Sequence, residues 1–170
     1  MFSENRPDVN LKTEICADSL VVPYRPSGFV GLSTEGTSVA FKDFRVETEG
    51  QTVYRTQWAD YDMAWHTVRG NWKAEDGVLT QQQTDGNALI WLKNRKFGDC
   101  TIHVKARKLK GREGFKVAFG GEDENHYFMA DMGSHTNESV LFREIGDKGS
   151  VSLFDYRNQE PVLVDHWYDV

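Results

Sequence analysis

The sequence is poor in the residues that form cross-links. Its 170 residues include only two cysteines, Cys16 and Cys100. Two cysteines are too few for a disulfide framework, and these two lie too far apart for a CxxC metal site. We therefore interpret them as small buried residues of strands, and a single bridge between them stays open as the alternative.

Positive charge and long apolar runs are also scarce. The chain has 20 Lys and Arg against 26 Asp and Glu, a formal net charge of -6, and even its most basic stretch, 105–116, contains Glu113. This balance argues against nucleic acid as a partner. No apolar run approaches membrane-spanning length, so no membrane partner is expected. The opening stretch MFSENRPDVN lacks the positive and apolar regions of a signal peptide. The localisation stays unknown, with a secreted or periplasmic parent protein as one alternative.

Motifs of the common catalytic classes are missing as well. The sequence contains no GxSxG around a serine, no HExxH among its five histidines and no glycine-rich phosphate loop. It also lacks the ExDxxE strand of jelly-roll glucanases. A glycoside hydrolase stays an alternative, because two carboxylates about 5 to 10 Å apart suffice for that reaction. The 26 acidic residues make such pairs unavoidable.

No cofactor is expected from these patterns. The one cluster of acids in a turn is GGEDEN, residues 120–125, which we interpret as a solvated loop. A structural calcium ion is the alternative there, since carboxylates and carbonyls in a turn suit a hard cation.

Short strand patterns, separated by Gly, Asp and Asn, make up most of the chain. The stretch 28–47 predicts two strands around a Glu35-Gly36 turn, with a bulge at Lys42-Asp43, and Asp76-Gly77 predicts a hairpin. No segment has a convincing helical period. Many short strands at regular spacing indicate an all-β fold, namely a two-sheet antiparallel β-sandwich of the jelly-roll type. The length suits one domain with a substantial core.

Aromatic residues are abundant, with five Trp, six Tyr and ten Phe. Seven of them alternate with polar residues on strands and are predicted to lie in the core: Phe41, Phe44, Trp72, Phe97, Phe115, Phe119 and Phe142. The stretch 124–144 differs, because Phe128 and Tyr127 put an aromatic side chain on each face of one strand. Tyr127, Met129 and Asp131 share one face and His126, Phe128 and Ala130 the other, and we expect something other than the domain's own core to cover one of the two faces.

Three stretches resemble a known family. They are GFVGLSTEGTSVAFKDFRVE, WHTVRGNWKAEDGVLTQ and CTIHVKARKLKGREGFKVAFGGEDENHYFMADMG. Together they resemble the concanavalin A-like, or laminin-G-like, jelly roll that is appended to bacterial family 51 alpha-L-arabinofuranosidases and to other polysaccharide-degrading proteins. The resemblance covers roughly residues 28–170. It implies a jelly roll with one concave face and an accessory, sugar-associated role, with catalysis performed by a separate barrel domain.

The resemblance also bears on the chain's organisation. In the family, a segment like DHWYDV runs directly into strands like those predicted for residues 9–22. We therefore expect a single, circularly permuted domain over 1–170, in which 9–47 supplies the closing strands and 51–170 the rest. Trp167–Val170 would then lie close to Asp8–Leu11. The alternatives are a slice across two adjacent rolls and a partner chain that supplies missing strands.

The favoured function is a non-catalytic carbohydrate-binding or accessory module of a glycoside hydrolase, with a polysaccharide or oligosaccharide as its partner. Such a site needs exposed rings to stack on sugars and polar groups to bond hydroxyls. The candidate stacking residues are Trp91, Tyr127 and Tyr156, and the candidate hydroxyl partners are Asp131, His135, Asn137 and Arg143. The alternatives are a glycoside hydrolase and a structural or protein-interaction sandwich, and a catalytic domain is a further expected partner.

Overall fold

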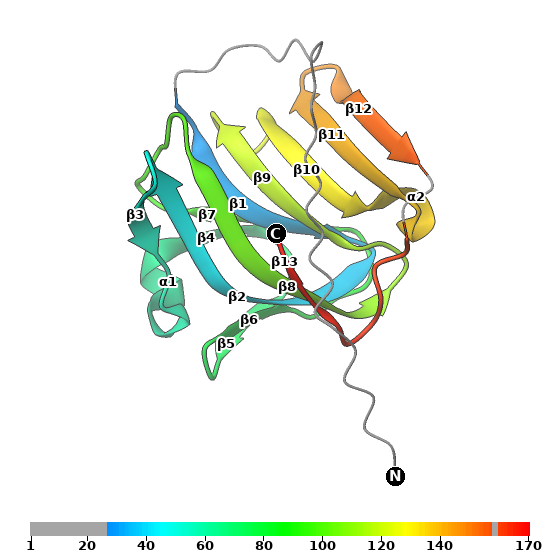
Figure 1. Ribbon diagram of the computed structural model, residues 1–170, viewed down its shortest axis with the longest axis horizontal. Coiled ribbons are helices and arrows are strands. Elements are labelled where there is room, and N and C mark those ends of the chain that lie inside the picture. Colours follow the sequence, from blue (N-terminus) through cyan, green and yellow to red (C-terminus); the bar gives the residue numbers. More distant parts are fainter. Residues whose placement is uncertain (1–26, 158–159) are drawn as a thin grey trace.

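Two antiparallel β-sheets pack as a sandwich in the computed structural model, which describes residues 27–157 and 160–170 (Figure 1). The seven-stranded sheet has the order β12-β11-β10-β9-β1-β7-β4. The six-stranded sheet has the order β13-β8-β2-β6-β5, and β3 pairs with β2 beside this path. The all-β, two-sheet expectation is therefore confirmed. The concanavalin A-like and laminin-G-like assignments stay predictions.

The strands are mostly short. The seven-stranded sheet contains β1 (Phe29–Glu35), β4 (Trp65–Arg69), β7 (Asn87–Leu92), β9 (Phe115–Gly121), β10 (Tyr127–Gly133), β11 (Ser139–Gly146) and β12 (Gly149–Arg157). The six-stranded sheet contains β2 (Thr37–Thr48), β3 (Gln51–Arg55), β5 (Trp72–Glu75), β6 (Val78–Gln81), β8 (Thr101–Gly111) and β13 (Trp167–Asp169). The helical elements are single turns: η1 (Trp58–Asp60), α1 (Tyr61–Ala64) and α2 (Ser134–Asn137). None of these described helices has the length and apolar character needed to cross a membrane.

The predicted turn at Glu35-Gly36 is present, but it joins the two sheets and does not form a hairpin. β1 pairs with β7 and β9 in one sheet, whereas β2 pairs with β6 and β8 in the other. Gly36 has a φ of +58°, a conformation that glycine adopts without steric cost. Residues 28–47 therefore supply a strand to the interior of each sheet.

Two local predictions from the sequence are confirmed. Asp76 and Gly77 both have positive φ, 50° and 76°, and connect β5 to β6 as a two-residue hairpin turn requires. In β2, the register with β8 shifts between Lys42 and Arg45, and Asp43 has a φ of 55°. Because of this bulge, Phe41 and Phe44 both point into the core and are 0% exposed.

The hydrophobic core lies between the two sheets. Phe41, Phe44 and Phe115 are buried in it, while Trp72, Phe97 and Phe119 pack against it with partial exposure. The seventh predicted core ring, Phe142, is half-buried and contacts Phe154 of β12 at a ring-centroid distance of 6.3 Å.

The last strand is part of the six-stranded sheet. Tyr168 of β13 lies opposite Ala106 of β8 and is buried in the core. Val170 donates to and accepts from the backbone of Val104, at 2.9 Å in each direction. Its expected neighbour, Asp8–Leu11, lies outside the described residues, as do Cys16 and the strands expected in 9–22. The permuted single domain over 1–170 therefore stays a prediction.

Removal of the Phe44 ring should test the core. The ring lies 5.0 Å from Trp65 and 6.3 Å from Tyr54, centroid to centroid. We expect Phe44→Ala to lower the free energy of unfolding by about 3–5 kcal/mol, because the cavity cannot fully collapse. Urea denaturation measures this. Met63→Ala is the control, since Met63 is 75% exposed, and equal effects of both variants would contradict the assignment.

Candidate functional site

A second apolar cluster lies on the face of the seven-stranded sheet that points away from the core, here called the outer face. Its buried members are Leu89, Trp91, Ala118, Tyr127 and Met129, with Phe29, Val68 and Ile145 packed against them. All eight come from strands of the seven-stranded sheet. Side chains alternate along a strand, so their neighbours Ile90, Val117 and Phe128 face the other way. The prediction that Tyr127 and Met129 share one face of their strand agrees with this arrangement.

Trp91 and Tyr127 form the centre of this face. Their rings meet edge to face, with centroids 5.3 Å apart and an interplanar angle of 82°. Trp91 lies on β7 and Tyr127 on β10, with β1 and β9 between them. The intervening residues must be small: a Cβ on Gly31 would approach the Trp91 ring to 2.6 Å. The sequence of β1 therefore makes room for an indole lying across the sheet.

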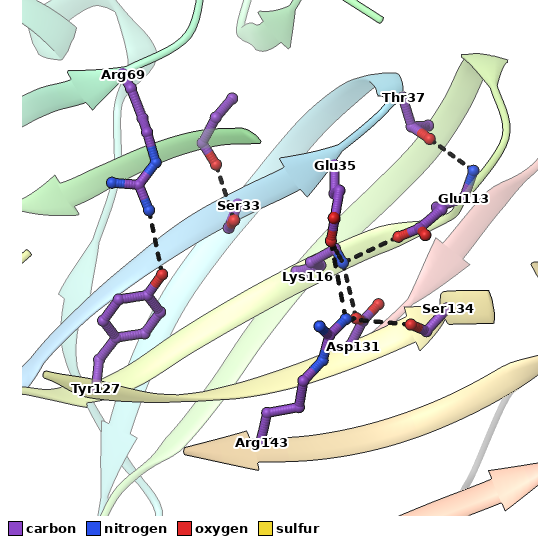
Figure 2. A network of polar contacts seen from close by, with 11 residues as sticks. Ser33, Glu35, Thr37, Arg69, Glu113, Lys116, Tyr127, Asp131, Ser134 and Arg143 are labelled. Carbon is purple, nitrogen blue, oxygen red and sulfur yellow. Dashed lines mark hydrogen bonds and ion pairs between the residues drawn. The ribbon is translucent and has the colours of Figure 1, made fainter. Parts of the chain in front are cut away.

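Lys116 is the centre of a charged network on the same face (Figure 2). It lies on β9 and is 1% exposed. Its Nζ donates to Asp131 at 2.7 Å, to Glu35 at 2.8 Å and to Glu113 at 3.0 Å. A buried ammonium group is tolerated only when its three donors are satisfied, and here three carboxylates satisfy them.

Arg143 of β11 joins the network from the other side of Asp131. Its Nη2 donates to Asp131 Oδ2 and, at 3.1 Å, to Ser134 Oγ, and it lies 3.9 Å from Glu35 Oε2. Asp131 is 0% exposed. Asp131 Oδ1 and Arg143 Nε are buried and have no hydrogen-bond partner among the described residues. The network therefore links β1, β9, β10 and β11 by ionic contacts.

The network keeps its groups charged. Burial lowers the pKa of Lys116, but the charge and hydrogen bond of Asp131, together with Glu113 and Glu35, outweigh burial and raise that pKa above its usual value. Burial likewise raises the pKa of Glu35, yet the hydrogen bond and charge of Lys116, with the charges of Arg143 and Arg112, hold it below its usual value of 4.5. Glu35 is therefore a carboxylate at neutral pH.

Two hollows open on the outer face. The first, called the polar hollow, has a volume of about 300 Å³ and is lined by Glu35, Arg69, Asn87, Tyr127 and Arg143, with Met129 and Ile145 also in contact with it. The second, called the acidic hollow, has a volume of about 580 Å³. Phe29, His66, Trp91, Asn94 and the turn 122–125 line it. Trp91 lines one hollow and Tyr127 the other, so the aromatic pair connects them.

The structure brings four of the seven predicted site residues together. Trp91, Tyr127, Asp131 and Arg143 all lie on the outer face, on β7, β10 and β11. Trp91 and Tyr127 are only 6% and 3% exposed. Both rings are therefore buried, and neither presents a full face on which a sugar could stack.

The other three predicted residues lie elsewhere. Tyr156 is 53% exposed and pairs with Val140 of β11, which puts it on the face opposite Arg143. His135 is exposed in α2 and lies 3.9 Å from Asp155. Asn137 binds the backbone of Val162 through both its amide nitrogen, at 2.9 Å, and its oxygen, at 3.0 Å. Its contacts attach the C-terminal segment to the sheet.

The acidic turn 120–125 is organised by hydrogen bonds. Asp123 Oδ1 accepts from the backbone of Asn125 at 2.7 Å and of His126 at 2.9 Å. The His126 ring contacts Asp123 and Asp147, each at 3.0 Å, and the hydrogen bonds with these two carboxylates raise its pKa above the usual value of 6.5. Within residues 27–157 and 160–170, no three His, Cys, Asp or Glu side chains are placed to hold a metal ion.

Four residues that line the polar hollow are not among the candidates predicted from the sequence: Glu35, Arg69, Asn87 and Lys116. Lys116 gave a usable signal, because it stands between Phe115 and Val117 in an apolar strand and such a lysine needs a buried partner. Glu35 was read only as a turn residue. Arg69 donates a hydrogen bond to Tyr127 Oη at 3.3 Å across 58 positions of sequence. No local sequence pattern indicates a contact between residues so far apart.

Loss of the Lys116 charge should destabilise the sheet. In Lys116→Met, the fully buried Asp131 keeps only Arg143 as a cation. We expect the free energy of unfolding to fall by about 3–5 kcal/mol, as for other buried ion pairs that lose one partner. Chemical denaturation measures this. The double variant Lys116→Met with Asp131→Leu should recover part of the loss, and a single variant as stable as the wild type would contradict the network.

Stability should fall in acid partly through Glu35. Its pKa is lowered in the folded state, so its contribution is present above its ordinary pKa and is lost as the pH falls through the folded value. We expect Glu35→Gln to lose less stability than the wild type between about pH 5 and pH 3, measured by thermal unfolding across that range. Glu49→Gln, in an exposed turn, should retain the wild-type slope; an unchanged slope in Glu35→Gln would refute the prediction.

Comparison with known proteins identifies one relative. Over 130 residues, the chain is 32% identical to an extracellular exo-alpha-L-arabinofuranosidase of Streptomyces chartreusis. The matched region is 75% of this chain but only 16% of the relative. No protein-family model matches the chain, and neither does any solved structure. The sandwich is therefore similar in sequence to one segment of a much longer arabinofuranosidase.

Proposed function

We propose that this chain is a non-catalytic carbohydrate-binding or accessory module of a glycoside hydrolase such as an alpha-L-arabinofuranosidase. The outer face of the seven-stranded sheet is its glycan-binding surface. The polar hollow beside the Trp91–Tyr127 pair carries this proposal. The similarity to a segment of an arabinofuranosidase supports it independently of the geometry.

The polar hollow has the two kinds of group that a sugar ring needs. The half-buried Ile145, with the small exposed parts of Met129 and Tyr127, offers apolar contact to the C–H groups of a ring. Arg69 and Asn87 can donate hydrogen bonds to hydroxyl groups, and the Glu35 carboxylate can accept them. Because Lys116 already holds Glu35 in place, little side-chain entropy is lost on binding.

The same contacts are unsuited to glycoside hydrolysis. That reaction needs one carboxyl group that donates a proton and a second that acts as base or nucleophile. Glu35 has a lowered pKa and therefore holds its proton poorly. Asp131 is fully buried beneath Lys116 and Arg143. A binding role therefore fits these groups better than a catalytic one.

A binding experiment on the outer face tests the proposal. Asn87 is exposed and lines the polar hollow, so Asn87→Ala removes hydrogen bonds to a ligand without opening the core. We expect the wild-type chain to bind oligosaccharides of arabinan or arabinoxylan on a glycan array. Asn87→Ala should weaken that binding by roughly five- to ten-fold, the effect of one or two hydrogen bonds, as measured by titration calorimetry.

Tyr156→Ala is the matched control, because Tyr156 is exposed but lies on the opposite face of the sheet. It should bind as the wild type does. Loss of binding in Tyr156→Ala with retention in Asn87→Ala would move the site to the other face. Binding to no polysaccharide would refute the proposal, and release of reducing sugar by the isolated chain would replace it with hydrolysis.

A further inference from the structure

Arg69 differs from the other cations of the polar hollow in its partners. Lys116 contacts three carboxylates, and Arg143 lies within 4.0 Å of two. Arg69 forms no ion pair with any residue in the described part of the chain, and its one side-chain hydrogen bond there is to Tyr127 Oη at 3.3 Å. Figure 2 draws Arg69 and Tyr127 as a separate pair beside the Lys116 network. Among the described residues that line this hollow, Arg69 is therefore the cation without a carboxylate partner.

Backbone and side-chain contacts hold Arg69 in place. It ends β4, where the register with β7 shifts between Thr67 and Arg69. Its backbone oxygen accepts a hydrogen bond from Trp72 Nε1 at 2.9 Å. Its side chain rests on Tyr127, whose ring is held by Trp91. Only Nη2 is used in the contact with Tyr127, and a guanidinium group offers further N–H donors in a planar fork that matches a two-oxygen acceptor.

The carboxylate that shares the hollow does not neutralise Arg69. Glu35 is bonded to Lys116 at 2.8 Å and lies 3.9 Å from Arg143. Glu35 shares these two cations with Asp131 and Glu113. The contacts of Glu35 are thus with Lys116 and Arg143 and not with Arg69, and an incoming carboxylate can pair with Arg69.

We propose, on the basis of the proposed function above, that Arg69 binds the carboxylate of a uronic acid in the recognised glycan. Tyr127 Oη and Asn87 are close enough to the same hollow to bond hydroxyls of that sugar. The hollow's volume of about 300 Å³ suits a single sugar unit.

The neighbouring acidic hollow limits the charge of the rest of the ligand. Glu122, Asp123 and Glu124 line it, and all three are exposed, while Lys93 is the one lysine or arginine among the described residues of its lining. A polyanionic chain that crossed the Trp91–Tyr127 pair would bring like charges together there, which is unfavourable. The favoured ligand is therefore a neutral oligosaccharide that carries one uronic acid.

Three probes separate these ligand classes in titration calorimetry. They are xylotetraose with one glucuronic acid branch, the same compound with its carboxyl group reduced to an alcohol, and trigalacturonate as a polyanion. We expect the acidic branched probe to bind about 10- to 100-fold more tightly than its reduced form, the effect of a charge-assisted bidentate pair. Its affinity should also fall with added salt, and trigalacturonate should bind more weakly.

Substitution of Arg69 identifies the contact. Arg69→Gln should remove the preference for the acidic probe over its reduced form. It should also weaken binding of the reduced form, by a smaller factor, because Arg69 can donate to hydroxyl groups as well. Arg55→Gln is the charge-matched control, because Arg55 lies on β3 of the other sheet, and it should preserve the preference. Tyr127→Phe, which keeps the ring, should reduce the preference by a smaller factor.

The outcomes distinguish the two proposals. Equal affinities for the acidic and reduced probes in the wild type would overturn the role of Arg69 and leave the carbohydrate-binding function standing. A preference that survives in Arg69→Gln would also overturn it. Tighter binding of trigalacturonate than of the branched probe would refute the limit set by the acidic hollow. Binding of none of these probes, or of any neutral glycan, would remove the proposed function itself.

Discussion

The buried ammonium group of Lys116 is the contact on which the outer face depends. A charge 1% exposed in the middle of a sheet is stable only if its partners surround it. Glu35, Glu113 and Asp131 do so from β1, from the loop before β9 and from β10, and Arg143 adds β11. Through these contacts, Lys116 joins the strands whose side chains line the polar hollow. The cost of removing it from water is offset by contacts that also position Glu35 towards solvent.

The seven-stranded sheet buries apolar side chains on both of its faces, in a different way on each. The inner face packs against the six-stranded sheet through a continuous apolar core. The outer face has no covering sheet among the described residues, so Trp91, Tyr127 and Met129 bury one another and leave hollows on either side. The outer face thus combines buried aromatic contacts with polar side chains around the hollows, and the carbohydrate-binding proposal is based on this combination.

Much of the local structure could be predicted from the sequence. The Asp76-Gly77 hairpin and the bulge after Lys42 follow from the conformational preferences of a few adjacent residues. The alternation in 127–131 separated the two faces of β10 correctly. The candidate site was harder, because its contacts join distant residues: Lys116 meets Glu35 across 81 positions of sequence. Tyr156 and Asn137 have the kinds of side chain that a sugar site needs, an aromatic ring and an amide, but they do not lie on the outer face.

The sequence by itself determined most of the described strands, though not β3 or β4, and it determined the main turns and the alternation of side chains along β10. These properties depend on backbone preferences and on a period of two residues, both of which are local. Only the tertiary structure decided that β1 and β2, separated by Gly36, belong to different sheets. It also decided which polar residues meet on the outer face. The physical reason is that backbone hydrogen bonds are alike for every pair of strands, so side-chain packing and charge pairing over long sequence separations select the partners.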